Sequence, residues 1–194
     1  MANCLMTVSE EACYLREATG TSAVAEAARA VAAALAQFDI AHLIAGGLAV
    51  QEHGYPRVTT DVDVIVPDVL EALEFGTSDV AGHLARIPTF QDRLKDKRSG
   101  VIIDLLPAGG VLKVGCQVPF PAPKSVNDHL QFITLEQLIS LKLDSWVNSP
   151  VRRLRDKTDV VELIIRRKLP RDLTIHQAVR DLYRETWDAI QAAR

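Results

Sequence analysis

Two stretches of the chain have the hydrophobic pattern of β-strands. Residues 61–66 read DVDVIV and residues 101–106 read VIIDLL, both rich in β-branched or leucine side chains. A weaker pattern at 89–94 predicts a hairpin partner for 101–106 across a polar turn. The expected strands are 40–45, 61–66, 89–94, 101–106 and 111–118.

Most of the remaining chain follows a helical period. An alanine-rich stretch after Thr21 or Ser22, either of which is a suitable N-cap, predicts the first helix. Thr174 is the expected N-cap of the last one, which runs to about Ala192. The expected helices are 22–38, 48–53, 69–75, 79–86, 135–147, 151–167 and the segment after Thr174.

This order of elements predicts an α/β (α+β) fold, with a small mixed, curved sheet, flanking helices and a C-terminal helical part. Prolines at positions 119, 121 and 123 interrupt the pattern where the chain becomes mainly helical. We therefore expect a core over residues 1–123 and a helical region over residues 124–194.

Composition adds few constraints. The 194 residues are 48% hydrophobic and 24% charged, which suits one substantial core in an ordinary soluble protein. Asp39 interrupts the most apolar stretch, and no secretory signal pattern opens the chain, so we expect a cytoplasmic protein without a membrane partner. Three cysteines without Cys-x-x-Cys spacing suggest neither a disulfide framework nor a zinc site.

Asp61 and Asp63 are the most informative charged residues. Side chains on a strand alternate between faces, so both aspartates share one face about 7 Å apart, opposite Val62 and Val64. Two carboxylates so close repel each other, and a divalent cation removes that cost. Such a pair is suited to holding the ions of phosphoryl or nucleotidyl transfer.

Two further features suit the same chemistry. Asp104 is the only charged residue of the apolar stretch 101–106, and it completes a cluster of three carboxylates if the two strands are neighbours. Gly46 and Gly47 precede a short helix, where a turn without side chains lets phosphate oxygens approach backbone N–H groups.

Basic residues form two groups, in 93–98 and in 152–168. A net charge of −3 and an aromatic content of 5% argue against extended nucleic-acid recognition, although a local contact with a phosphate backbone stays open for 152–168. We interpret 93–98 as the solvated end of the hairpin, with contact to an acceptor as the alternative. His53 is expected to pack against or cap the short helix.

The order Gly46-Gly47, short helix, Arg57-x-Thr59-x-Asp61-x-Asp63 and a later strand aspartate resembles the nucleotidyltransferase superfamily that includes DNA polymerase beta. More narrowly, it is similar to small prokaryotic members related to abortive-infection and toxin–antitoxin nucleotidyltransferases. The similarity covers residues 40–107 well. It is looser from residue 132 onward, where LEQLISLKLDSW and RLRDKTDVVELI are similar to the helical tail of those proteins.

The resemblance implies catalytic, metal-binding carboxylates at Asp61, Asp63 and Asp104, with Mg²⁺ or Mn²⁺ as cofactor and a nucleoside triphosphate as substrate. Many relatives have Gly-Ser at the turn. Because Gly47 stands in place of that serine, backbone N–H groups and cationic side chains would have to bind the phosphates. The implied nucleotide-binding residues are Gly46, Gly47, Arg57, Thr59 and Lys142.

The resemblance further implies transfer of a nucleoside monophosphate to an acceptor hydroxyl on tRNA, a protein or a small molecule such as an aminoglycoside. The alternative function is a non-catalytic nucleotide-binding or toxin–antitoxin module on the same fold, with an antitoxin as partner. Lys142 has the alternative of a surface lysine with its amino group in water. Asp156 and Asp159 are expected to pair with Lys142 or Arg155, with solvation as the alternative.

Overall fold

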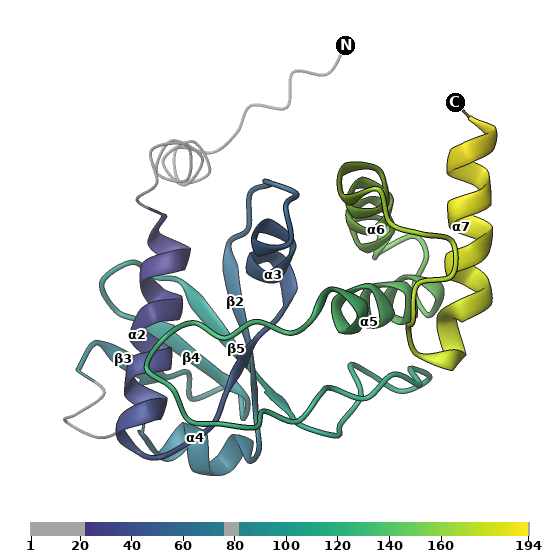
Figure 1. The fold of residues 1–194 in the computed structure, drawn as a ribbon. Coiled ribbons are helices and arrows are strands. Elements are labelled where there is room, and N and C mark those ends of the chain that lie inside the picture. Colours follow the sequence, from purple (N-terminus) through teal and green to yellow (C-terminus); the bar gives the residue numbers. More distant parts are fainter. Residues whose placement is uncertain (1–21, 76–81, 194) are drawn as a thin grey trace.

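A five-stranded mixed sheet lies at the centre of the computed structural model, which describes residues 22–75 and 82–193 (Figure 1). Its strand order is β1 (Leu43–Ile44), β2 (Asp61–Val66), β5 (Ile102–Pro107), β4 (Arg93–Asp96) and β3 (Leu84–Arg86). β2 and β5 run parallel, and the other neighbouring pairs are antiparallel. The small mixed sheet expected from the sequence is therefore present.

One face of the sheet packs against α2 (Ala23–Gln37) and α4 (Val69–Phe75) (Figure 1). Val62, Val64 and Val66 of β2 are fully buried in this cluster, as the alternating pattern requires. The Ser22 hydroxyl caps α2 by accepting a hydrogen bond from the Ala25 N–H at 3.4 Å.

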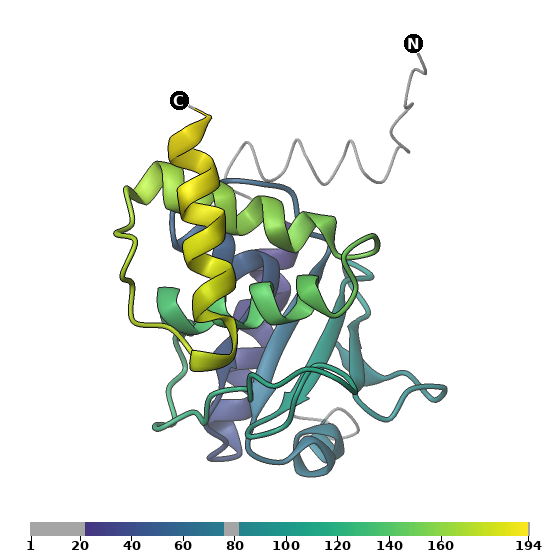
Figure 2. The same ribbon diagram turned by 90° about the vertical axis from the view of Figure 1, so that its right-hand side faces the viewer.

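The other face of the sheet carries a second hydrophobic cluster, which α3 (Gly46–Glu52), α5 (Leu135–Val147), α6 (Leu154–Arg167) and α7 (Arg180–Ala192) cover. Figure 2 shows α5, α6 and α7 gathered beside one another. Ile65 of β2 belongs to this second cluster. Side chains two residues apart on a strand point to the same face of the sheet. Asp61 and Asp63 therefore lie on the same face as Ile65, which the C-terminal helices cover.

Several sequence-based boundaries are confirmed without change, namely 61–66, 69–75 and 135–147. The hairpin partner of β5 is also confirmed, although β4 spans Arg93–Asp96 and not 89–94, so it includes the first residues of the predicted turn. The helix predicted for 79–86 is wrong in its described part, because Leu84–Arg86 pairs with β4 as a strand. Residues 79–81 lie outside the described residues.

Two more predictions need correction. Residues 111–118 form no strand; the Cys116 side chain packs inward and Asp144 binds the N–H groups of Gln117 and Val118. The last helix begins at Arg180 and not after Thr174, since the intervening chain includes a 3₁₀ turn at Gln177–Val179.

Other expectations concern single features. The His53 ring bonds the Ile133 carbonyl at 2.8 Å, and the residue is the C-cap of α3, as predicted. Within the described residues, no helix is both long and apolar enough to cross a membrane. The division of the chain at residue 123 stays a prediction.

Candidate active site

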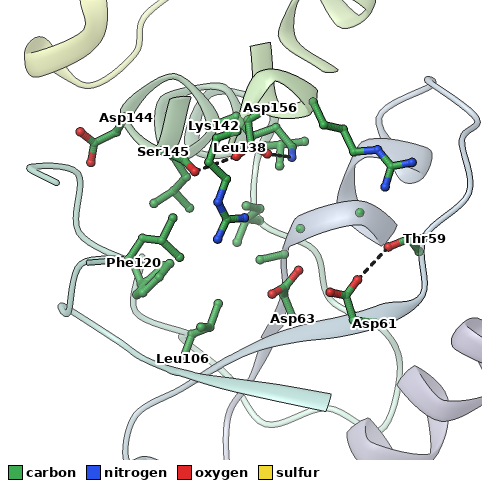
Figure 3. Close-up of a pocket in the computed structure, with 18 of the residues that line it drawn as sticks. Thr59, Asp61, Asp63, Leu106, Phe120, Leu138, Lys142, Asp144, Ser145 and Asp156 are labelled. Carbon is green, nitrogen blue, oxygen red and sulfur yellow. Dashed lines mark hydrogen bonds and ion pairs between the residues drawn. The ribbon is translucent and has the colours of Figure 1, made fainter. Parts of the chain in front are cut away.

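A cavity of about 280 Å³ opens between β2 and α3 on one side and α5 and α6 on the other. Figure 3 shows Asp61 and Asp63 on one wall, facing the helical wall that carries Lys142, Ser145 and Asp156. Its polar and charged lining consists of Gly46, Gly47, Arg57, Thr59, Thr60, Asp61, Asp63, Lys142, Asp144, Ser145, Arg152, Arg153, Arg155 and Asp156. The apolar lining includes Leu106, Phe120 and Leu138.

The two glycines allow α3 to begin directly against the aspartates. Gly46 has a positive φ of 58°, and a Cβ at this position would overlap the Asp63 carboxylate. A Cβ on Gly47 would overlap the Thr59 hydroxyl. The Ala45 N–H also donates to the Asp63 carbonyl at 2.9 Å. The glycine pair therefore makes room for the Asp63 and Thr59 side chains and also leaves the turn free of side chains.

Asp61 and Asp63 differ in their surroundings. The Thr59 hydroxyl donates to Asp61 Oδ1 at 3.1 Å. Burial, together with the charges of Asp61 and Asp104, raises the pKa of Asp63 to about 7. Near neutral pH this carboxyl is therefore partly protonated, and a cation near it would favour the ionised form.

Asp104 lies beside this pair. Asp63 and Asp104 are direct partners across the parallel β2–β5 ladder, so their side chains share one sheet face, as predicted from the sequence. Burial raises the pKa of Asp104 although Arg93 opposes the shift. The Arg93 Nε lies 2.6 Å from Asp104 Oδ1, so this carboxylate is already in an ion pair.

The donor set suits a hard divalent cation. Carboxylate oxygens are the ligands that Mg²⁺ and Mn²⁺ prefer, whereas His and Cys favour other metals. Within residues 22–75 and 82–193, however, no three His, Cys, Asp or Glu side chains converge on a common point suitable for a metal. Asp61 and Asp63 are available for such an ion, and Asp104 is turned to Arg93.

A buried network of charges joins the two walls of the cavity. Asp159 of α6 accepts a hydrogen bond from Arg57 at 2.9 Å, and its other carboxylate oxygen lies 2.7 Å from the Arg57 Nε in an ion pair. Asp159 also pairs with the Lys142 Nζ at 2.7 Å. Lys142 pairs in addition with Asp156 at 2.9 Å, and Asp156 accepts from the Ser145 hydroxyl at 2.7 Å. The expected pairing of both aspartates with Lys142 is thus confirmed.

Lys142 lines the cavity, but its amino group is held by two carboxylates of α6 and is not free. Only 6% of the residue is exposed, which excludes the alternative of a solvated surface lysine. Burial alone would raise the pKa of Asp156, but Lys142 and Ser145 outweigh burial and hold it below its usual value. The nucleotide-binding role of Lys142 stays a prediction.

Sequence reasoning missed the part of the lining that comes from the α5–α6 connection. Arg152, Arg153 and Arg155 are exposed residues of the cavity wall, whereas the sequence interpretation considered for them a local contact with a nucleic-acid backbone. These arginines follow Lys142 by about ten residues, across a short connection between two helices. This spacing could have indicated that they line the same cavity as Lys142. Asp144 was also missed, and it serves the fold by accepting the N–H groups of Gln117 and Val118.

Comparisons with known proteins identify no family. No protein-family model matches the chain, and no curated protein matches it. Among solved structures, the solution structure of the antibiotic-resistance factor ANT(2'')-Ia is similar over 84% of this chain and 90% of that one, with 13% identity and a TM-score of 0.46. The function of the cavity therefore rests on its own residues.

Proposed function

We propose that the protein is a metal-dependent nucleotidyltransferase that moves a nucleoside monophosphate from a nucleoside triphosphate to an acceptor hydroxyl. The observation that carries this proposal is the set of three aspartates, with Asp61 and Asp63 on one strand face and Asp104 in register beside Asp63. The cavity in front of Asp61 and Asp63 is also lined by arginines, which suits an anionic substrate.

The carboxylates of Asp61, Asp63 and Asp104 would hold Mg²⁺ or Mn²⁺. When bound, such an ion neutralises charge on the phosphate oxygens and polarises the phosphorus centre. Thr59 keeps Asp61 oriented through its hydrogen bond, so we assign it a positioning role. In the proposed reaction the acceptor oxygen forms a bond to the α-phosphorus and the bond to pyrophosphate breaks. Asp104, once free of Arg93, aligns the acceptor hydroxyl and takes up its proton.

The phosphates would be held from two sides. Gly46 and Gly47 leave the start of α3 free of side chains next to Asp63. Arg152, Arg153 and Arg155 line the same cavity from the helical side, and their guanidinium groups match phosphate oxygens well. Arg57 and Lys142 add positive charge deeper in the cavity, although both are engaged by Asp159.

The direct test is label transfer. The purified protein is incubated with Mg²⁺ and each ribonucleoside triphosphate labelled at the α-phosphate, together with tRNA, a cell protein extract or an aminoglycoside. We expect label on one acceptor class with the wild type and a loss of at least about 100-fold for Asp63→Asn, the scale of removing one group that stabilises transition-state charge. The matched control is Asp128→Asn, an exposed carboxylate outside the cavity lining.

The outcomes separate the candidate functions. Magnesium-dependent binding of a triphosphate without transfer to any acceptor would favour the non-catalytic nucleotide-binding module, for which an antitoxin partner stays a prediction. Neither binding nor transfer by the wild-type protein would overturn the proposal.

A further inference from the structure

Arg93 occupies a specific position relative to the three aspartates. It is the direct cross-strand partner of Asp104 in the antiparallel β4–β5 ladder, just as Asp63 is the partner of Asp104 on the other side. The three residues therefore form one row across β4, β5 and β2. Side chains of directly paired residues lie on the same sheet face, so Arg93 and Asp63 flank Asp104.

The ion pair between Arg93 and Asp104 is short, and an aromatic ring packs against the arginine. The Arg93 Nε lies 2.6 Å from Asp104 Oδ1, and the side chains are 37% and 23% exposed. The guanidinium also stacks over the Phe90 ring at 4.3 Å from its centroid. A planar guanidinium held by an aromatic face loses less freedom on pairing than a free lysine would. Arg93 is thus fixed at the edge of the aspartate row.

A divalent cation shared by Asp104 and Asp63 would use the Asp104 carboxylate, whose Oδ1 Arg93 already engages. The two cations would also repel each other at that distance. No three metal-binding side chains converge on one point in the described part of the chain, which agrees with Asp104 being turned toward Arg93.

We propose that Arg93 is a built-in counter-ion that occupies Asp104 in the free protein and competes with the divalent cation for this carboxylate. The inference rests on the proposed function, because it takes Asp104 as a metal ligand. Arg93 is accordingly a positioning residue that sets the metal affinity of the third carboxylate. Binding of the ion releases the guanidinium from Asp104 while its stacking on Phe90 keeps it nearby.

The test measures Mn²⁺ binding by calorimetry on the full chain without nucleotide. We expect Arg93→Gln and Arg93→Ala to bind Mn²⁺ about tenfold more tightly than the wild type, which corresponds to about 1.4 kcal/mol. The gain should vanish when Asp104→Asn is combined with either change, since the competition needs that carboxylate. Lys95→Ala is the matched control, because it removes the same charge from an exposed residue of the same strand that pairs with Ile102 and not with Asp104.

A second measurement uses the wild type and covers the case in which an Arg93 variant fails to fold. The side-chain Nε–H signal of Arg93, observed by NMR, should shift as Mg²⁺ is added and the guanidinium leaves Asp104. In the Asp104→Asn protein the same signal should not respond to Mg²⁺.

Each contrary result has a distinct meaning. Unchanged or weaker Mn²⁺ affinity in the Arg93 variants, or an Arg93 signal indifferent to Mg²⁺ in a wild type that binds the ion, overturns the inference but leaves the proposed function standing. An equal gain in Lys95→Ala also overturns it, because the effect would then be one of general charge. A wild type that binds neither ion overturns both proposals.

Discussion

At the scale of single residues, Asp63 combines the most constraints. Gly46 packs against its carboxylate, its backbone carbonyl accepts the Ala45 N–H, and the charges of Asp61 and Asp104 act on it. These contacts leave the Asp63 carboxyl little freedom to move away from the carboxylates of Asp61 and Asp104. Its ionisation is therefore coupled to the stability of the protein.

We predict that the free energy of unfolding without metal rises as the pH falls from 8.5 to 6.5. The folded-state pKa of Asp63 is raised from 3.8 to about 7, so the folded protein takes up a proton that the unfolded chain does not. That contribution is present at low pH and is lost as the pH rises through about 7. It amounts to about 1 kcal/mol over this range. Denaturant unfolding in the presence of a chelator measures it.

The control for this prediction is Asp63→Asn, which should lack that part of the pH dependence, whereas Asp128→Asn should keep it. Below pH 6.5 the comparison is less direct, because burial lowers the pKa of His42 and stability is lost as the unfolded-state histidine takes up its proton. Identical pH profiles for the wild type and Asp63→Asn would contradict the prediction.

At the scale of elements, α5 and α6 are joined by a buried ion pair network as well as by their hydrophobic faces. Lys142 of α5 bridges Asp156 and Asp159 of α6, and Asp159 also binds Arg57 from the segment before β2. Removing one partner of a buried network leaves charges without compensation. The network therefore fixes the helical wall of the cavity against the sheet.

We predict that Lys142→Ala lowers the free energy of unfolding by about 3 kcal/mol, since Asp156 loses its cation and Asp159 keeps only Arg57. Lys124→Ala, which removes an exposed lysine, should change it by less than about 0.5 kcal/mol. Denaturant unfolding compares the three proteins. Equal stability of Lys142→Ala and the wild type would show that the network contributes little to the fold.

The sequence predicted those elements whose pattern is strong by itself. The alternation at Asp61–Val66 and the helical spacing at Leu135–Val147 gave both elements with their observed bounds. The strand at Leu84–Arg86 was missed, because three residues are too few for a period and their structure depends on pairing with β4. The segment 111–118 has strand-like residues, but the N–H groups of Gln117 and Val118 donate to Asp144 and not to a neighbouring strand.

For the candidate site, the sequence predicted that Asp104 would lie beside Asp63, which the strand register confirms. It could not predict that Arg93 would hold Asp104, because a cross-strand pair depends on a register that no local pattern specifies. The ion pairs of Lys142 with Asp156 and Asp159 could likewise not be predicted with certainty, because the sequence offers several nearby charges as candidate partners.

At the scale of the whole molecule, the cavity lies on the sheet face that carries the second hydrophobic cluster, between β2 and the helices α5 and α6. A ligand bound there contacts both the sheet and the helices. Since such a ligand binds only the folded state, its binding energy adds to the stability of the entire chain.

We predict that Mg²⁺ raises the melting temperature and that a nucleoside triphosphate with Mg²⁺ raises it further. Saturation at 100 times Kd adds about 2.7 kcal/mol, or several degrees for a chain of this size. Asp63→Asn should abolish the response to Mg²⁺ while its melting temperature without metal equals or exceeds that of the wild type. Differential scanning calorimetry measures both, and a wild type indifferent to metal and nucleotide would contradict the prediction.

The position of β2 has a further consequence for amide hydrogen exchange. Its Val62, Val64 and Val66 side chains belong to one hydrophobic cluster and Ile65 to the other, so neither cluster can open without disturbing this strand. Its amides should exchange only through global unfolding and be among the slowest of the chain. The proposed catalytic aspartates are thus attached to the part of the backbone that opens last. On heating, the proposed transferase activity should persist until the protein as a whole unfolds.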